Sequence, residues 1–238
     1  TDQAVTVSGK PYLCKTDGTL EVMKNNTWTF YNDAYYYVKN NQVLANCIEK
    51  IGMYSYAFAS NGQMYSREAF YMDVKGSNGK TENKRFLAKA NGALYMNSWV
   101  KFDGSWYYTG ADGGAYTGRK TISGKQYYFY ENGSLSVNNV EEDQNKIYSS
   151  DDKGVLTEVK GNNVWKRLHG EWYYIKDHAL LQNGIYKIGN DYYGFYTNGA
   201  MRTDQLFREQ IANSDGSYVY WLADQNGKLK RNGWAKWN

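Results

Sequence analysis

The 238-residue sequence has few of the residues that build reactive or cross-linked sites: two cysteines, two histidines and one proline. Cys14 and Cys47 can form one bridge or remain two buried thiols, and a single pair carries no disulfide pattern that would assign a redox compartment. His169 and His178 have no third metal ligand near them in the sequence. We therefore expect no metal site and no cofactor.

The sequence also lacks long apolar runs and clusters of one charge sign. No segment reaches the length of a membrane span, and the first residues, TDQAVTVSGK, are not a signal peptide, which a mature secreted chain would also lack. The net charge is only +4 and its charges are dispersed, which excludes the basic footprint typical of nucleic-acid binding. Neither a membrane span nor a nucleic-acid partner is expected.

Catalytic constellations are missing as well. Acidic residues gather at 141–143 and 151–152, but this is the least aromatic part of the chain and is typical of a solvated surface rather than of a glycosidase carboxylate pair. The Asp-Gly and Asn-Gly pairs do not continue to the glutamate that an EF-hand loop requires. The sequence predicts that the chain is not an enzyme.

Aromatic residues are abundant instead, with 25 Tyr and 8 Trp. They concentrate in stretches such as NSWVKFDGSWYYTGADGGAYTG (97–118), which holds almost no aliphatic residues. Tyrosine and tryptophan combine a large apolar surface with a polar group, so they suit half-buried positions and surfaces that stack on ring-shaped ligands.

Turn pairs recur about every 21 residues along the whole chain. They are Asp17-Gly18, Asn61-Gly62, Asn91-Gly92, Asp112-Gly113, Asn132-Gly133, Lys153-Gly154, Asn198-Gly199 and Asn226-Gly227, with Asn40-Asn41 and Asp177-His178 in the two gaps. Asn-Gly and Asp-Gly between aromatic or β-branched runs are strong hairpin signals, because the turn needs φ > 0. The spacing predicts about ten β-hairpins.

The residues around each turn keep the same register. Six residues before the second turn residue the chain carries Tyr12, Tyr35, Tyr56, Phe86, Tyr107, Tyr127, Tyr148, Trp172, Tyr193 and Trp221, and two residues after it an apolar side chain. We expect the aromatic set to form the core, although Trp172 matches Trp106 instead if Ala179 is taken as the turn residue. No helical periodicity is present. The predicted fold is all-β, an elongated solenoid-like array of about ten hairpins whose neighbours share their aromatic faces.

Three segments carry a family resemblance: WVKFDGSWYYTGADGGAYTG (99–118), TISGKQYYFYENGSLSVN (121–138) and IYKIGNDYYGFYTNGAMRTD (185–204). They resemble units of the cell-wall-binding repeat superfamily, which includes choline-binding repeats and the glucan-binding repeats of glucansucrases. We divide the continuous array into diverged repeats at 1–96 and clearer repeats at 97–238. The resemblance implies an extracellular solenoid that binds choline or carbohydrate between successive repeats, beside an enzyme domain.

Candidate ligand-binding rings are those at positions where other repeats are polar. Trp106 occupies a position that holds Arg85, Gln126 and Glu171 in other repeats, so packing alone does not require a ring there. Trp28, Trp99 and Trp165 lie 13 or 14 residues before their turns, at a generally apolar position where burial competes with ligand contact. The predicted binding residues are Trp99, Lys101, Trp106, Tyr108, Trp165, Trp172, Trp234 and Trp237.

The predicted function is that of a secreted, cell-surface module that binds α-glucan of the starch or dextran type. Its partners are the polysaccharide and either the bacterial cell wall or a linked enzyme domain. One alternative is a choline or teichoic-acid anchor, and another is a structural spacer or protein-interaction solenoid. Thr121 and Gln126 stand where a second, consecutive choline cage needs tryptophan, which favours sugar over choline.

Overall fold

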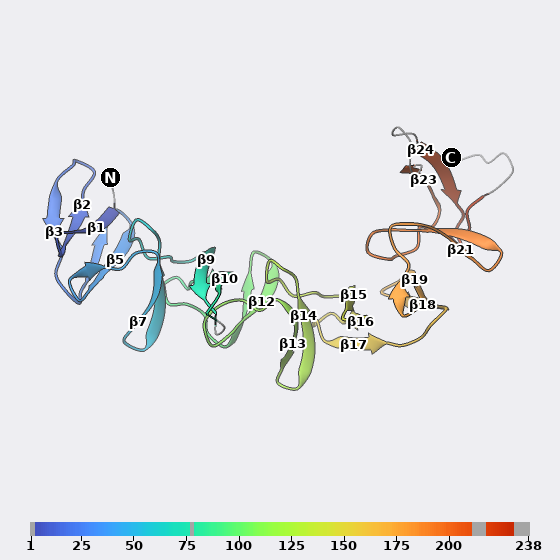
Figure 1. Cartoon of the computed structure of the whole chain (residues 1–238), viewed down its shortest axis with the longest axis horizontal. Coiled ribbons are helices and arrows are strands. Elements are labelled where there is room, and N and C mark those ends of the chain that lie inside the picture. The colour runs from blue at the N-terminus through green and yellow to red at the C-terminus, as the bar shows by residue number, and fades with distance from the viewer. Residues whose placement is uncertain (1–2, 77–78, 211–217, 231–238) are drawn as a thin grey trace. The chain divides into compact units, whose positions relative to one another are not determined.

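The computed structural model describes residues 3–76, 79–210 and 218–230 (Figure 1). The described residues form ten antiparallel hairpins and contain no helix, which confirms the predicted fold class. None of the described segments is a helix long and apolar enough to cross a bilayer.

Each hairpin consists of two strands of mostly four to seven residues. The pairs are β1 (Gln3–Val7) with β2 (Lys10–Cys14), β4 (Trp28–Tyr31) with β5 (Ala34–Lys39), β7 (Cys47–Ile51) with β8 (Tyr54–Phe58), β9 (Ala69–Lys75) with β10 (Thr81–Leu87), β11 (Ser98–Phe102) with β12 (Ser105–Thr109), β13 (Gly118–Ile122) with β14 (Lys125–Phe129), β15 (Val140–Asp143) with β16 (Lys146–Ser150), β18 (Val164–Leu168) with β19 (Glu171–Lys176), β21 (Gly184–Ile188) with β22 (Asp191–Phe195), and β23 (Gln205–Gln210) with β24 (Tyr218–Ala223). Short third strands extend four of them: β3 (Leu20–Val22), β6 (Gln42–Val43), β17 (Leu156–Val159) and β20 (Ala179–Leu180).

The chain divides into two compact units. The first comprises Thr1–Gly118 with Phe129–Leu135, and the second comprises Arg119–Tyr128 with Ser136–Asn238. In both units the core is a series of small apolar clusters along the chain rather than one large core. This is expected where each hairpin packs mainly on its neighbours in sequence.

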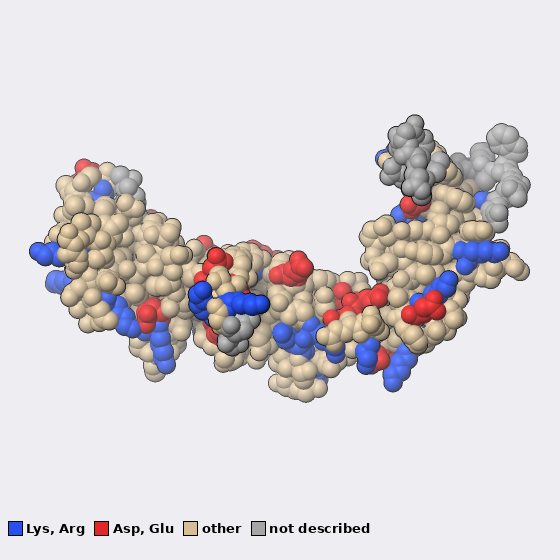
Figure 2. Space-filling model, viewed as in Figure 1, with Lys and Arg blue, Asp and Glu red and all other residues tan. Residues whose placement is uncertain are grey.

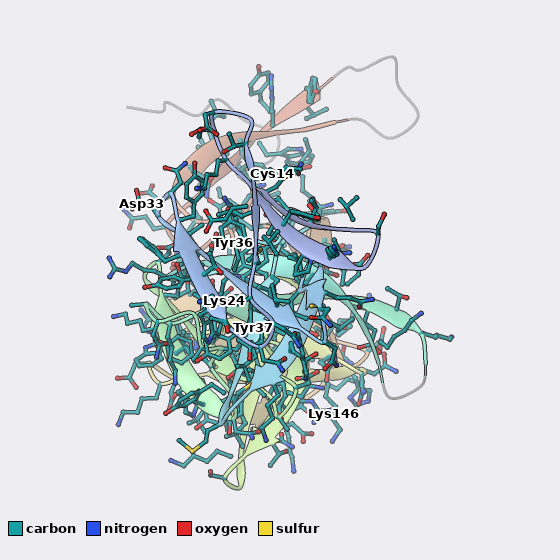
Figure 3. The ribbon with its side chains drawn as sticks, turned by 90° about the vertical axis from the view of Figure 1, so that its left-hand side faces the viewer. Cys14, Lys24, Asp33, Tyr36, Tyr37 and Lys146 are labelled. Carbon is teal, nitrogen blue, oxygen red and sulfur yellow. The ribbon has the colours of Figure 1, made fainter. Side chains whose placement is uncertain are left out.

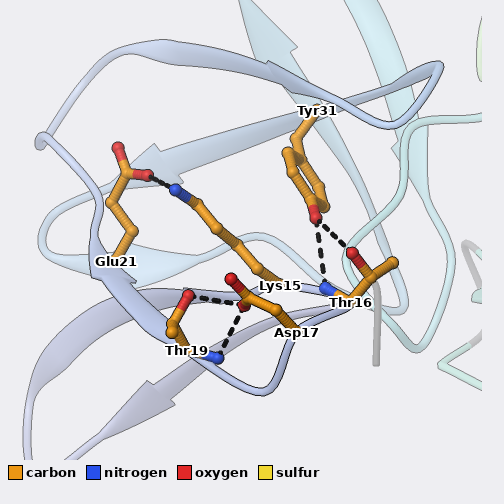
Figure 4. Close-up of polar contacts among 6 residues, drawn as sticks. All are labelled: Lys15, Thr16, Asp17, Thr19, Glu21 and Tyr31. Atoms are coloured by element: carbon orange, nitrogen blue, oxygen red, sulfur yellow. Dashed lines mark hydrogen bonds and ion pairs between the residues drawn. The ribbon is translucent and has the colours of Figure 1, made fainter.

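The turn after the first hairpin shows how the Asp-Gly and Asn-Gly pairs act (Figure 4). The Asp17 carboxylate accepts hydrogen bonds from the Thr19 amide at 2.9 Å and the Thr19 hydroxyl at 2.7 Å, while Gly18 takes a φ of 83°. A short acidic or amide side chain followed by glycine satisfies the turn backbone locally. The same side-chain bond to the amide two residues on recurs at Asn61, Asn91, Asp112, Asn132 and Asn198.

A repeated backbone hydrogen bond joins six pairs of successive hairpins. The amide two residues after a turn glycine donates to a carbonyl in the second strand of the preceding hairpin, at 2.7–2.8 Å. The donor–acceptor pairs are Met64–Tyr35, Leu94–Ser55, Ala115–Arg85, Leu135–Trp106, Met201–Trp172 and Leu229–Tyr192. We call the acceptor residue the slot residue of its hairpin.

Close packing between hairpins depends on the turn glycines. A Cβ built at Gly92 would overlap the thioether of Met64, and one at Gly227 would lie 2.5 Å from the Met201 sulfur. Both glycines also have φ near 80°, which side chains disfavour. These two glycines therefore allow both the turn and the approach of the preceding repeat.

The predicted aromatic core is confirmed in part. Phe86, Tyr107 and Tyr148 are buried, and Tyr12, Tyr56, Tyr127, Tyr193 and Trp221 are half-buried. The prediction is wrong for Tyr35, which is 45% exposed. Trp172 is 41% exposed, and for it the alternative register holds, in which it matches Trp106. In their hairpins the next residues, Tyr36 and Tyr173, are buried instead. Tyr36 and the following Tyr37, both on β5, are labelled in Figure 3.

The error has a local cause. Asn40-Asn41 and Asp177-His178 form two-residue turns in which both residues have φ of 51–64° without any glycine. These tight turns join β5 to β6 and β19 to β20, so the aromatic register shifts by one residue relative to the glycine turns.

Basic and acidic side chains are interspersed on the side drawn in Figure 2, so no face with one sign of charge is seen there. The two cysteines, Cys14 on β2 and Cys47 on β7, are both free thiols and half-buried. Burial and the neighbouring Glu49 raise the pKa of the Cys47 thiol.

Candidate functional site

Three hairpins carry a tryptophan in the first strand and an exposed aromatic slot residue in the second strand. They are the second, fifth and eighth hairpins, with Trp28, Trp99 and Trp165 paired across the strands with Tyr37, Tyr108 and Tyr174. The slot residues of the same hairpins are Tyr35, Trp106 and Trp172, exposed by 45%, 43% and 41%. The predicted exposure of Trp106 is confirmed.

In the second hairpin Trp28 lies among four rings. Its ring centroid is 4.9 Å from that of Tyr37, 6.3 Å from Tyr35 and, across to the next hairpin, 5.0 Å from Tyr56 and 6.0 Å from Phe58. The Tyr35, Tyr37 and Tyr56 rings meet Trp28 edge-on, at 63–86°. This packing fixes the indole while Tyr35 remains exposed beside it.

The eighth hairpin reproduces this arrangement. Trp165 lies 5.0 Å from Tyr174, 6.4 Å from Trp172, 4.9 Å from Tyr193 and 6.0 Å from Phe195, with interplanar angles within 6° of those around Trp28. Because these hairpins belong to different compact units, the agreement is a property of the repeat itself.

Both ring sets border a pocket. One, of about 390 Å³, is lined by Trp28, Tyr35, Tyr56, Met64, Ala90 and Asn91. The other, of about 330 Å³, is lined by Trp165, Trp172, Tyr193, Met201, Gln225, Asn226 and Lys228. Each pocket thus combines two rings of one hairpin, a ring and a methionine of the next, and turn residues of the hairpin after that.

We name these the Trp28 site and the Trp165 site. Their composition, stacked or edge-on rings beside a few polar groups, suits a ligand with a flat apolar face and a polar edge. Neither pocket has an Asp or Glu among its described lining residues.

The fifth hairpin holds the predicted cluster around Trp99. Trp99 is 37% exposed and lies 5.2 Å from Tyr108 and 5.9 Å from Phe129, and Tyr108 lies 5.2 Å from Tyr116. Lys101 is exposed and pairs directly with Trp106 across the strands. The structure thus brings together the four predicted residues of this hairpin, Trp99, Lys101, Trp106 and Tyr108.

In the other seven hairpins the position of Trp28 is filled by a residue without an aromatic ring. These residues are Ala4, Ile48, Ala69, Arg119, Val140, Ile185 and Leu206. In the sixth hairpin the matching residue is Arg119 and not the predicted Thr121, because the position lies four residues before the Ser123-Gly124 turn. The tryptophan therefore recurs at every third hairpin, about 70 residues apart.

Sequence comparisons align nearly the whole array with streptococcal enzymes. The chain is 26% identical over 243 residues to glucosyltransferase-I of Streptococcus downei, covering 98% of this chain and 14% of that protein. It is 27% identical over 185 residues to glucosyltransferase-S of Streptococcus mutans, covering 77% of this chain and 12% of that protein. The chain thus spans about one-seventh of the length of these curated relatives or less. No family model matches it.

Among solved structures, the modular autolysin LytC of Streptococcus pneumoniae aligns over 96% of this chain and 46% of its own chain, at 23% identity and a TM-score of 0.46. An alternansucrase solved in complex with isomaltononaose aligns over 97% of this chain and 17% of its own, at 18% identity and a TM-score of 0.34.

The Trp165 site differs from the Trp28 site in its polar residues. Lys228 lines the pocket, and its ammonium lies 2.7 Å from the Asp191 carboxylate. Hydrogen bonding to Asp191 raises the pKa of Lys228, so the side chain stays charged. In the Trp28 site the matching position is Ala93, because Tyr56 pairs with Ala93 as Tyr193 pairs with Lys228.

Several residues of these sites are not among the predicted binding residues. Trp28 is one, and Tyr35, Tyr56 and Tyr193 are others that the sequence pattern assigns to the core. The spacing of Trp28, Trp99 and Trp165 by three repeats is the signal that could have found the Trp28 site. The predicted residues Trp234 and Trp237 lie outside the described residues.

Proposed function

We propose that the chain is a non-catalytic carbohydrate-binding module that holds saccharide rings of an α-glucan at the tryptophan sites of the second, fifth and eighth hairpins. The observation that carries this proposal is the agreement between the Trp28 and Trp165 sites. The same five-ring arrangement, at the same spacings, borders a pocket in both compact units.

Exposed rings at these pockets support binding of a sugar. The faces of pyranose rings are apolar and stack on tryptophan or tyrosine, while the hydroxyl groups at their edges need hydrogen-bond partners. At the Trp165 site Gln225, Asn226 and Lys228 supply such partners next to Trp172. Curved α-linked chains present these faces in succession.

The charge at the Trp165 site favours a neutral ligand over a cation. Lys228 keeps its positive charge at the pocket, and its ion pair with Asp191 already balances the charge of that carboxylate. A quaternary ammonium placed there would gain attraction from the rings but would approach a fixed ammonium group.

A module without catalysis is supported by the extent of the alignments, since the chain matches only 12–14% of the glucosyltransferases. We propose that it acts outside the cell, where an enzyme linked to it or a bacterial wall meets polysaccharide. The glucosyl units implied by the names of the relatives make glucan the first ligand to test.

A second candidate, binding of a choline-type cation, is favoured by one observation at the Trp28 site. Its lining residues carry three aromatic rings and no charged group. Such a pocket can attract a quaternary ammonium through the faces of the rings.

Calorimetry distinguishes these functions. Wild-type protein would be titrated with maltotriose, isomaltotriose and choline, and the same titrations repeated with Trp172→Ala and, as a control, Tyr220→Ala. Tyr220 is 66% exposed but belongs to a hairpin with Leu206 in place of the tryptophan. The proposal predicts saccharide binding that weakens in Trp172→Ala and not in Tyr220→Ala. Binding of choline alone would establish the second candidate, and binding of none of the three would favour a structural spacer or protein-interaction solenoid.

A further inference from the structure

Arg85 occupies the slot position of the fourth hairpin. Its carbonyl accepts the inter-hairpin hydrogen bond from the Ala115 amide, as the carbonyls of Tyr35 and Trp172 accept theirs from Met64 and Met201. Where those hairpins place an exposed ring beside a pocket, the fourth hairpin therefore places a guanidinium group.

The guanidinium lies where the pockets of the other hairpins lie. Its carbon is 5.0 Å from the ring centroid of Tyr107, which matches Tyr56 and Tyr193 in register. One of its terminal nitrogens donates to the Asn132 carbonyl at 3.3 Å, and Asn132 is the turn residue that matches Asn91 and Asn226. Arg85 thus spans the same ring and the same turn that border the open pockets.

A second guanidinium covers the matching ring from a different position of its hairpin. Arg119 stands at the tryptophan position of the sixth hairpin, and its guanidinium lies 4.8 Å from the ring centroid of Tyr148, the matching ring of the seventh. Its side chain is held by Asp143 at 2.7 Å and Gln144 at 3.0 Å.

The hydrogen bonding of Arg85 shows that this is not a position built for arginine. Its Nε is buried and has no hydrogen-bond partner among the described residues. A buried donor without an acceptor is unfavourable; attraction to the rings of Tyr71 and Tyr107 and the hydrogen bond to the Asn132 carbonyl offset this cost.

We infer that the interfaces after the fourth and sixth hairpins are latent saccharide sites, each closed by the chain's own arginine in the place of the ligand. This inference rests on the proposed function and extends it, because it states which residues close the interfaces after the fourth and sixth hairpins. An interface opens when the arginine is replaced and the two rings are restored.

The first test is a gain of binding. Ala69→Trp with Arg85→Trp places in the fourth hairpin the two rings that Trp99 and Trp106 provide in the fifth. Titration with the trisaccharide that binds wild type, maltotriose or isomaltotriose, should show one additional equivalent bound per chain. A folded double variant with unchanged stoichiometry overturns the inference, whereas failure of wild type to bind either trisaccharide counts against the proposed function alone.

The second test needs no saccharide. Arg85→Ala should leave a cavity over Tyr107 that methylguanidinium fills. Addition of methylguanidinium should therefore change the Tm of this variant more favourably than that of wild type, by on the order of 2 °C at the same additive concentration. The matched control is Arg167→Ala, because Arg167 is exposed and donates to the Gly170 carbonyl at 3.4 Å. Rescue of Arg85→Ala and not of the control supports the inference, and equal responses of the two variants overturn it.

Discussion

Removing the exposed ring of the Trp165 site should separate binding from folding. Trp172 is 41% exposed and its ring meets Trp165 edge-on at 6.4 Å. Its carbonyl accepts from the Met201 amide at 2.7 Å, a backbone bond that Trp172→Ala keeps. Because the substitution removes only this peripheral edge-on ring, we expect the free energy of unfolding to fall by only about 1 kcal/mol.

The loss of binding should be larger than the loss of stability. Stacking on one ring contributes about 1–3 kcal/mol by analogy with base stacking on aromatic side chains. Affinity at this site should therefore fall about 5- to 150-fold. Trp165→Ala is the contrasting variant, because Trp165 contacts four rings, and its replacement should cost about 3 kcal/mol of folding stability.

The assay is calorimetric titration with maltotriose and isomaltotriose, together with thermal unfolding of each variant. If Trp172→Ala unfolds near the wild-type temperature and binds every saccharide with unchanged affinity and stoichiometry, then the slot ring does not contact ligand and the reasoning fails.

Three further outcomes follow from the packing of the repeats. Gly92→Ala should lower the Tm by several degrees in differential scanning calorimetry. The new Cβ would overlap the Met64 thioether, and the backbone φ of 79° is unfavourable for alanine. Burial opposes ionisation of Asp112, but the Lys84 ammonium at 2.8 Å and the hydrogen bond from the Gly114 amide together lower the pKa of the carboxyl. The stabilisation from the Lys84–Asp112 pair should be fully present above about pH 4 and be lost as the pH falls through the lowered pKa of Asp112. Unfolding curves of Asp112→Asn should not show this loss. Thiol titration of unreduced, denatured protein should count two thiols, Cys14 and Cys47, and a count of zero would contradict the free thiols of the structure.

The number of hairpins could be predicted because each repeat carries one locally encoded turn pair. The pairs follow the two long strands instead of joining them: Asp17-Gly18 lies after β2, and Ser8-Gly9 joins β1 to β2. An Asn or Asp side chain bonds the backbone two residues on, and the following glycine supplies positive φ, so the turn pair is visible in the sequence. The positions of the two turns without glycine could be predicted but not their length, because Asn40-Asn41 and Asp177-His178 adopt positive φ without that marker. This single-residue shift misplaced Tyr35.

The site was harder to predict because each pocket draws on three hairpins. Trp165 and Trp172 share a hairpin and could be paired by sequence pattern, but Tyr193 comes from the next and Asn226 from the one after. No local pattern distinguishes the half-buried ring of Tyr193 from the buried ring of Tyr107, which lies under Arg85. Only the packing between repeats separates a pocket wall from a core residue.

The number of saccharides bound per chain tests the central claim most directly. Wild type should bind three equivalents of maltotriose or isomaltotriose, one for each hairpin with tryptophan. The combined variant Tyr35→Ala, Trp106→Ala and Trp172→Ala should unfold cooperatively and bind none at the same concentrations. A folded triple variant that keeps the wild-type stoichiometry and affinity would contradict the account.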